Sequence, residues 1–206
     1  MNTPKWERFF KEKCLDIFLN SKEVVDIGGS LRLDTGRSNR VDKKNDWLRE
    51  YVERVNYRIL DPVPDYNPDI VGDIHALPFS DNSKEAILCL AVLEHVENPI
   101  LAMQQLHRVL CPGGRLLIYV PFLYYYHAEK GYYGDYWRFT YDTLVMLAKP
   151  FSKYEITEVR MPIETLTRLT PLGRWDLFIL FARVLDGLFY TKGSRQVSGY
   201  YMYLVK

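Results

Sequence analysis

Three of the first four apolar segments in the sequence end on an aspartate. These aspartates and the residues beside them are Asp26 with Gly28 and Gly29, Asp61, and Asp73 with Ile74. A single aspartate after a strand is commonly no more than a turn former. Three carboxylates at one edge of a sheet would repel one another, and a cationic ligand rich in hydroxyl groups would relieve that repulsion. The pattern therefore indicates a small-molecule site at this edge.

The carboxylates share an edge only if their segments are parallel strands, and the rest of the sequence favours that arrangement. Strands are expected at Glu23–Ile27, 56–62, 69–74, Glu85–Leu90, 115–122, Lys153–Val159 and 199–205. Most are nearly continuous apolar runs separated by helices or loops, which is typical of a parallel sheet buried on both faces. We predict an α/β fold with a Rossmann-like, doubly wound sheet of seven strands, mostly parallel, with a C-terminal antiparallel hairpin strand at the edge.

The length of 206 residues suits a single domain over 1–206. An N-terminal helix is expected within residues 1–20, and a helical insertion within 161–196, between the last two strands. A further helix begins at Asn98 and is expected to end at the "CPGG" run, because glycine commonly follows the last helical residue.

The composition narrows the classes of partner and compartment. A formal net charge of +1 gives no reason to expect nucleic acid as a partner. The three cysteines have no C-x-x-C spacing, and charges run through the first 20 residues, so we expect reduced thiols, no export signal and a cytoplasmic protein. The four histidines show neither H-x-x-H nor H-E-x-x-H spacing, so the sequence predicts no metal site.

Five segments, of which the first three contain the aspartates described above, follow one another in this order: "DIGG", "LDP", "GDIHALPFSDNS", "LAVLEHVENP" and "VLCPGGRLLIYVPF". In this set the chain resembles the class I S-adenosylmethionine-dependent methyltransferases, in particular the small methyltransferases associated with sugar-polymer biosynthesis. The similarity runs from "VVDIGGS" to "DYWRFT", more than half of the chain. The resemblance implies S-adenosylmethionine as cofactor and a small-molecule or glycan acceptor. We expect O-methylation of a saccharide or a lipid-linked saccharide.

The resemblance also implies contacts with the cofactor at four strand ends. The positions concerned are Asp26, Gly28, Gly29, Asp61, Asp73, Ile74, Leu90 and Ala91. The first aspartate and its glycine turn would hold the methionine end, the second would accept from the ribose hydroxyls, and the third from the adenine amino group. The isoleucine backbone would lie beside the adenine ring, and the leucine and alanine would pass under the methionine portion. A cofactor without phosphates can use a shorter glycine turn than a dinucleotide does.

The stretch "PFLYYYHAEKGYYGDYWRFT" follows the fifth strand and resembles the substrate side of the family. A hydroxyl acceptor must lose a proton, and His127 and Asp135 are the candidate bases. Tyr126, Trp137 and Arg138 are candidate contacts of the acceptor. In the alternative interpretation, the tyrosines and Trp137 pack a lid and Arg138 makes a structural ion pair.

Other functions have less support. The glycine loop lacks G-x-G-x-x-G, which disfavours a nicotinamide-dependent enzyme, and no G-x-S-x-G elbow of a hydrolase occurs. The serious alternative is a degenerate methyltransferase fold that acts as a non-catalytic binding or scaffold subunit. Arg32, where the family commonly has glycine, favours this alternative. His95 is expected to cap or pack a helix, with lining of the site as the other interpretation.

The insertion contains a segment, 175–190, that is apolar on nearly every face. A helix of this kind must be buried or must meet another apolar phase, and this one is too short to cross a bilayer. One interpretation is packing over the edge of the sheet or at a homodimer interface. The other is peripheral membrane contact, with basic residues near the ends of the helix meeting anionic head groups. Those residues are Arg168, Arg174, Lys192 and Arg195.

Overall fold

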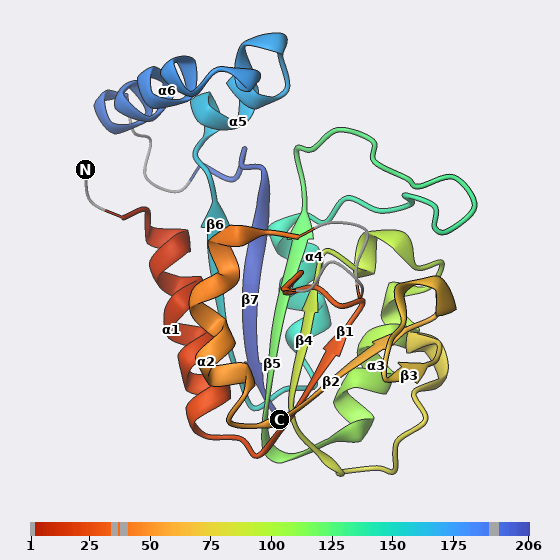
Figure 1. The fold of residues 1–206 in the computed structure, drawn as a ribbon. Coiled ribbons are helices and arrows are strands. Elements are labelled where there is room, and N and C mark those ends of the chain that lie inside the picture. Colours follow the sequence, from red (N-terminus) through yellow and green to blue (C-terminus); the bar gives the residue numbers. More distant parts are fainter. Residues whose placement is uncertain (1–2, 34–36, 38–40, 190–193) are drawn as a thin grey trace.

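The computed structural model describes residues 3–33, 37, 41–189 and 194–206. Its centre is a seven-stranded sheet with the strand order β3-β2-β1-β4-β5-β7-β6 (Figure 1). The strands are β1 Glu23–Ile27, β2 Asn56–Asp61, β3 Ile70–Val71, β4 Lys84–Leu90, β5 Leu110–Pro121, β6 Lys153–Val159 and β7 Gly199–Val205. The pairs from β3 to β5 are parallel, and β7 runs antiparallel to both β5 and β6. The predicted fold class is confirmed, with the antiparallel hairpin at one edge and β6 outermost.

Helices cover both faces of the sheet. They are α1 Lys5–Leu19, α2 Arg49–Val52, α3 Pro99–Val109, α4 Tyr141–Ala148, α5 Pro162–Arg168 and α6 Asp176–Leu188. Short 3-10 turns lie at η1 Lys43–Leu48, η2 Pro64–Tyr66, η3 Ile74–Ala76, η4 Leu93–His95 and η5 Pro171–Arg174. The apolar residues of α1 and η1 bury one face of the sheet, and those of α3 and α4 bury the other.

Strand β4 shows why the sheet is covered twice. Ile87 and Cys89 belong to the core under α3 and α4, whereas Ala86 and Leu88 belong to the core under α1. Successive side chains of a strand point to opposite faces, so a continuous apolar run supplies both cores at once.

The start of β5 differs from the prediction. Helix α3 ends at Val109, and the "CPGG" run lies within the strand instead of capping the helix. The pairing with β4 jumps from Leu110 to Arg115, so the intervening residues form an irregular bulge. Gly113 has φ +79°, and a Cβ on Gly114 would lie 2.8 Å from the carbonyl oxygen of Cys111. The glycines are therefore needed for the bulge.

Helices α5 and α6 stand beyond the carboxyl ends of the strands (Figure 1). Helix α6 packs mainly on α5 and η5. The large apolar residues of the described 175–189 segment that remain exposed are Trp175, Leu177, Phe178, Leu180, Phe181, Val184, Leu188 and Phe189. The first sequence interpretation was packing over the edge of the sheet or at a homodimer interface. Within the described residues the main contacts of α6 are with α5 and η5 instead of the sheet, and the homodimer interface stays a prediction. Tyr190 and Lys192 lie outside those residues.

The contact between α5 and α6 includes buried polar groups beside the buried Ile179 and Ala182. Both oxygens of the buried Asp186 carboxylate accept hydrogen bonds from backbone N–H groups at the start of α5, those of Ile163 and Glu164. The buried Glu164 carboxylate forms ion pairs with Arg168 and Arg183. None of the helices in the described part of the chain combines the length and apolar character that crossing a membrane requires.

Candidate active site

The carboxyl ends of β1 and β4 mark the place where the strand order reverses. Strand β1 lies between β2 and β4, so connections leave it in opposite directions across the sheet. Ligands of open α/β sheets bind in the crevice at such a point. Gly28 and Gly29 follow β1, and Ala91 follows β4, so these predicted residues lie at this point.

The glycine turn after β1 requires glycine for two reasons. Gly28 and Gly29 have φ +77° and +55°, a region that side chains disfavour. A Cβ on Gly28 would also lie 2.8 Å from Cγ2 of Val92, beyond the end of β4. The turn therefore brings bare backbone to the crevice, which is the shape a cofactor contact needs.

The side chain of Asp26 holds this turn in place through hydrogen bonds. Its buried carboxylate accepts hydrogen bonds from the backbone N–H groups of Ser30 and Leu31, at 2.9 and 3.0 Å. The hydroxyl groups of Ser30 and Tyr57 donate to it as well. Burial raises the pKa of Asp26, and these hydrogen bonds act against that rise. Asp26 thus holds the glycine turn in position. A ligand at this edge would contact the turn, and Asp26 would act on the ligand only through the turn.

The Asp61 carboxylate accepts fewer hydrogen bonds within the described part of the protein than the Asp26 carboxylate does. It ends β2, and its Oδ1 accepts a hydrogen bond from the backbone N–H of Val63 at 2.8 Å. Among the described residues, no hydrogen bond is made to its Oδ2. Burial raises the pKa of Asp61, and the nearby charge of Asp26 adds to the rise. A ligand that donates to Oδ2 would lower the cost of this partly buried charge.

Asp73 and Ile74 lie beside the next strand end. The Asp73 side chain caps η3, with Oδ1 accepting from the backbone N–H of His75 at 2.8 Å. The His75 ring in turn accepts from the backbone N–H of Asn98 at the start of α3, at 3.2 Å. Ile74 is buried, and the Asp73 side chain is 61% exposed, so its second oxygen can reach a ligand.

The end of β4 carries a strained residue. Ala91 has φ +56°, a left-handed conformation that is uncommon for residues other than glycine. Its backbone N–H donates to the Tyr119 carbonyl at 2.9 Å, and the preceding Leu90 is buried. The conformation turns the chain sharply into η4. This turn places Glu94 and His95 at the same edge of the sheet.

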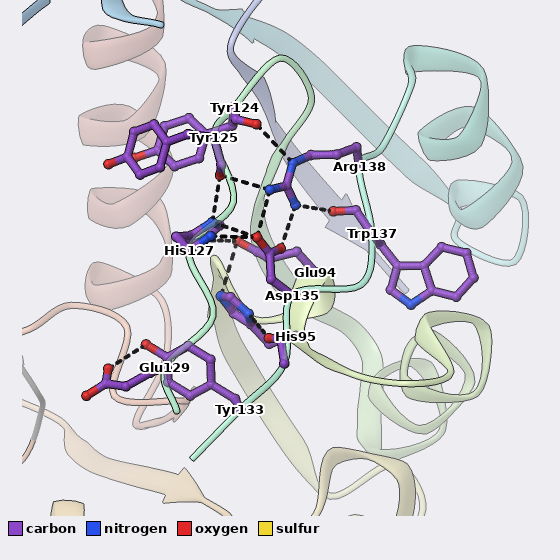
Figure 2. A network of polar contacts seen from close by, with 11 residues as sticks. Glu94, His95, Tyr124, Tyr125, His127, Glu129, Tyr133, Asp135, Trp137 and Arg138 are labelled. Carbon is purple, nitrogen blue, oxygen red and sulfur yellow. Dashed lines mark hydrogen bonds and ion pairs between the residues drawn. The ribbon is translucent and has the colours of Figure 1, made fainter. Parts of the chain in front are cut away.

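The side chains of Glu94, His95 and His127 point toward one another in Figure 2. Glu94 is 1% exposed, and within the described part of the chain neither of its carboxylate oxygens accepts a hydrogen bond. Oε1 lies 3.9 Å from Nε2 of His95 and 3.8 Å from Nε2 of His127. Burial lowers the pKa of His95, whereas the Glu94 carboxylate raises the pKa of His127.

The structure brings together His127 and Asp135, the two candidate bases of the sequence analysis. The Asp135 carboxylate accepts from the His127 backbone N–H at 2.8 Å and lies 3.2 Å from His127 Nδ1. Arg138 forms a two-point ion pair with the same carboxylate, at 2.6 and 2.8 Å. These hydrogen bonds from Arg138 hold the pKa of Asp135 well below its usual range. Asp135 is therefore a fixed anion that orients His127 and is unsuited to accept a proton.

The guanidinium group of Arg138 donates hydrogen bonds to several groups of the protein itself. Besides Asp135, it donates to the carbonyl oxygens of Tyr124, Tyr125 and Trp137 (Figure 2). The structural ion pair considered as the alternative for Arg138 is thus present. It holds the 122–140 segment in place.

Tyrosines line a hollow beside this cluster. The hollow has a volume of about 500 Å³ and is open to solvent, and its lining includes Tyr126, Glu129, Tyr132, Tyr133 and Gly134. Tyr126 is 75% exposed. Trp137 lies apart from this lining, with its indole N–H donating to the carbonyl oxygen of Val96 at 2.8 Å. The acceptor side of the site thus has an aromatic surface next to the histidines.

Comparison with known proteins gives partial sequence matches. Residues 43–118 match the family model described as a methyltransferase domain. A segment of 76 residues, 37% of the chain, is 38% identical to an uncharacterized 37.1 kDa protein in transposon TN4556 of Streptomyces fradiae, covering 21% of that protein. A segment of 49 residues, 24% of the chain, is 43% identical to demethylmenaquinone methyltransferase of Renibacterium salmoninarum, covering 21% of it. The chain thus spans about a fifth of the length of these curated relatives.

The whole chain superposes on a solved structure, a SAM-dependent methyltransferase from Archaeoglobus fulgidus. The TM-score is 0.63 at 12% sequence identity, over 100% of this chain and 95% of the other. The fold is that of S-adenosylmethionine-dependent methyltransferases. In this fold, the glycine turn and the strand-end carboxylates lie at the edge described above.

Two residues of this cluster were not assigned to the site from the sequence. Glu94 had no assigned role, and for His95 capping or packing of a helix was favoured over lining of the site. His95 instead faces Glu94 and His127, while its Nδ1 lies 2.6 Å from the carbonyl oxygen of Gly134. The available signal was position: "LEH" follows β4 directly, at the same edge as the glycine turn.

Proposed function

We propose that this protein transfers a methyl group from S-adenosylmethionine to an oxygen of a small acceptor. The observation that carries the proposal is the glycine turn at the reversal of strand order, with the available Asp61 carboxylate on the next strand. When bound, the cofactor would supply a methyl group on a sulfonium, whose leaving group is neutral. The protein then chiefly has to align the two reactants and exclude water.

The cofactor would lie along the ends of β1, β2 and β4. The Gly28–Gly29 backbone, held by Asp26, would contact the methionine end, and Asp61 Oδ2 would accept from a ribose hydroxyl. The exposed oxygen of Asp73 would accept from the adenine amino group. These groups fit a cofactor that offers a diol and an exocyclic amine and carries no phosphate.

The acceptor would lie in the tyrosine-lined hollow beside the cluster. His127 is the proposed base or acceptor-orienting group, because its Nε2 faces the interior of the cluster and Asp135 holds its other side. Tyr126 is the proposed contact for the acceptor in the exposed part of the hollow. Aromatic faces with hydroxyl groups suit a saccharide, which offers both C–H faces and hydroxyls.

We further propose that the saccharide is attached to a lipid and that α6 lies on the membrane surface. Helices α5 and α6 and the 122–140 segment extend from the same end of the sheet (Figure 1). The exposed Phe178 and Phe181 supply an apolar face, and Arg174 lies at the start of α6. A helix of this kind can lie in the head-group region with its apolar face in the acyl chains.

The test of the reaction has two parts. Calorimetric titration with S-adenosylhomocysteine should show one saturable site per chain, and an acceptor panel of saccharides and lipid-linked saccharides should then reveal turnover. The absence of cofactor binding would favour the alternative function, a non-catalytic binding or scaffold subunit. Arg32 is the residue that favours that alternative, since it adopts φ +54° where the family commonly has glycine.

A further inference from the structure

We propose that Glu94, His95 and His127 bind a divalent transition-metal ion, for which Zn²⁺ is the suitable probe. One ligand atom from each of the three side chains lies within 4.8 Å of the other two. Two imidazoles and one carboxylate are a ligand set that suits such ions and leaves coordination positions open. The proposal stands on the geometry of these side chains, and it rests on the proposed function only for what the ion would do in the reaction.

The first argument is the buried carboxylate of Glu94, which is 1% exposed and makes no hydrogen bond within the described residues. The two histidine rings lie near it, at 3.8 and 3.9 Å from Oε1. A buried carboxylate without hydrogen bonds is costly, and proteins normally satisfy such groups by pairing or by metal coordination. The nearby guanidinium of Arg138 is already engaged by Asp135, at 2.6 and 2.8 Å. A cation between Glu94 and the histidines would supply the missing partner.

The second argument is the orientation of the two imidazole rings. Nδ1 of His95 lies 2.6 Å from the carbonyl oxygen of Gly134. Nδ1 of His127 lies 3.1 Å from the carbonyl oxygen of Tyr125 and 3.2 Å from Asp135. A carbonyl oxygen only accepts hydrogen bonds, so in each neutral ring the proton is on Nδ1.

In their neutral forms, both rings present the lone pair of Nε2 toward Glu94; for His127, whose pKa the Glu94 carboxylate raises, a bound metal ion would replace the Nε2 proton. Histidine ligands of metal ions show this arrangement, in which the second ring nitrogen donates to a carbonyl or carboxylate and so fixes the tautomer. Asp135 would serve as that carboxylate for His127. Arg138, which holds Asp135, would extend the support by one more residue.

The distances favour a shared ion over a direct ion pair. The Nε2 atoms lie 3.9 and 3.8 Å from Glu94 Oε1, too far for a hydrogen bond. Ligands placed about 2.0–2.2 Å from a common zinc ion are separated by roughly 3.3–3.6 Å. The two Glu94–histidine distances would therefore have to shorten by a few tenths of an ångström, and the widest pair of ligand atoms, which lies within 4.8 Å, by up to about 1.5 Å.

The open positions of the ion would face the acceptor side. The Tyr133 ring, which lines the hollow, lies 4.5 Å from the His95 ring between centroids. An oxygen of the acceptor could therefore bind the ion directly. Under the proposed function, the ion would position that oxygen opposite the methyl group, and His127 would act as a ligand that orients the acceptor.

The experiment measures metal binding without cofactor or acceptor. Chelator-treated full-length protein is titrated with Zn²⁺ by calorimetry, and the Co²⁺ form is examined by visible absorption. We expect one ion per chain and Co²⁺ bands that Zn²⁺ removes. Glu94→Gln and His95→Ala should each weaken Zn²⁺ binding by at least about 100-fold, since loss of even an outer-shell partner typically costs 10- to 100-fold. His107→Ala, which changes a histidine packed against Phe151 away from the cluster, should bind as wild type does.

Two variants keep the test falsifiable. Glu94→Gln removes a buried charge and keeps the shape, so it should fold even if His95→Ala does not. The proposal is overturned if wild type binds no ion at one per chain, or if both variants bind as tightly as wild type. Binding of S-adenosylhomocysteine is measured in a separate titration, so failure of the metal site and failure of the proposed function give different results.

Discussion

Replacing Asp61 by asparagine tests the cofactor edge with the least change in shape. Oδ1 of Asp61 accepts from the backbone N–H of Val63 at 2.8 Å, and the carbonyl oxygen of asparagine can retain that bond. The other oxygen becomes an NH₂ group, which donates at the position where the ribose hydroxyl is proposed to donate. The variant therefore keeps the turn and removes one charged acceptor.

The expected effect on binding follows from the loss of a single charge-assisted hydrogen bond. Such a bond contributes about 1.5–3 kcal/mol, so Asp61→Asn should weaken S-adenosylhomocysteine binding about 10- to 100-fold. Stability should be unchanged or higher. Burial and the charge of Asp26 raise the pKa of Asp61, so its ionised form opposes folding above that pKa, and this penalty disappears as the pH falls through it. At neutral pH the uncharged asparagine removes the same penalty.

The assay is calorimetric titration with S-adenosylhomocysteine, together with the unfolding temperature from circular dichroism. Asp65→Asn is the matched control, because Asp65 is exposed on the same connection and its side chain reaches Tyr132, at 3.3 Å, on the acceptor side. It should bind as wild type does. A folded Asp61→Asn variant with unchanged affinity would refute the ribose assignment, and an equal loss in Asp65→Asn would attribute the effect to the loop.

The remaining predictions concern the acceptor side and the apolar face. His127→Ala should lower turnover by about 10²–10⁴-fold with unchanged affinity for S-adenosylhomocysteine; near-normal turnover on an identified acceptor would exclude His127. Arg138→Lys should lower the free energy of unfolding by about 1.5–3 kcal/mol, as the two-point pair with Asp135 is lost; an unchanged urea denaturation curve would contradict this. Wild type should float with anionic vesicles and a Phe178→Asp, Phe181→Asp double variant should not. If wild type stays unbound and the double variant converts a dimer to a monomer, a second copy covers α6.

The positions of most strands along the chain, and their carboxyl ends, were predictable because they depend on local sequence. A buried parallel strand needs a continuous apolar run, and "VVDI" and "AILCL" supply one each. The glycine turn could be located in the same way, since φ values of +77° and +55° leave glycine as the suitable residue. The role of Asp26 was harder to predict. Its carboxylate accepts a hydrogen bond from the hydroxyl group of Tyr57, which lies 31 residues further along the chain.

The features that the sequence did not predict depend on contacts between distant segments. A "CPGG" run can end a helix or form a bulge, and the pairing of Leu110 with Lys84 selects the bulge. The surroundings of α6 could not be read from its apolar composition either. Its buried polar residue, Asp186, binds the start of α5, and this contact leaves the apolar side chains on the outside.

The cluster of Glu94, His95 and His127 depends on a backbone contact that also positions the 122–140 segment, the proposed acceptor loop. The carbonyl oxygen of Glu94 accepts from the backbone N–H groups of Tyr136 and Trp137, at 2.8 and 3.2 Å. The main chain of η4 therefore holds the segment that carries Asp135, and Asp135 orients His127 toward the Glu94 side chain. Histidine spacing along the chain could not predict this site, because His127 comes 32 residues after His95 and reaches it only through this loop. The same residue, Glu94, thus anchors the acceptor loop by its backbone and provides the cluster's buried charge by its side chain.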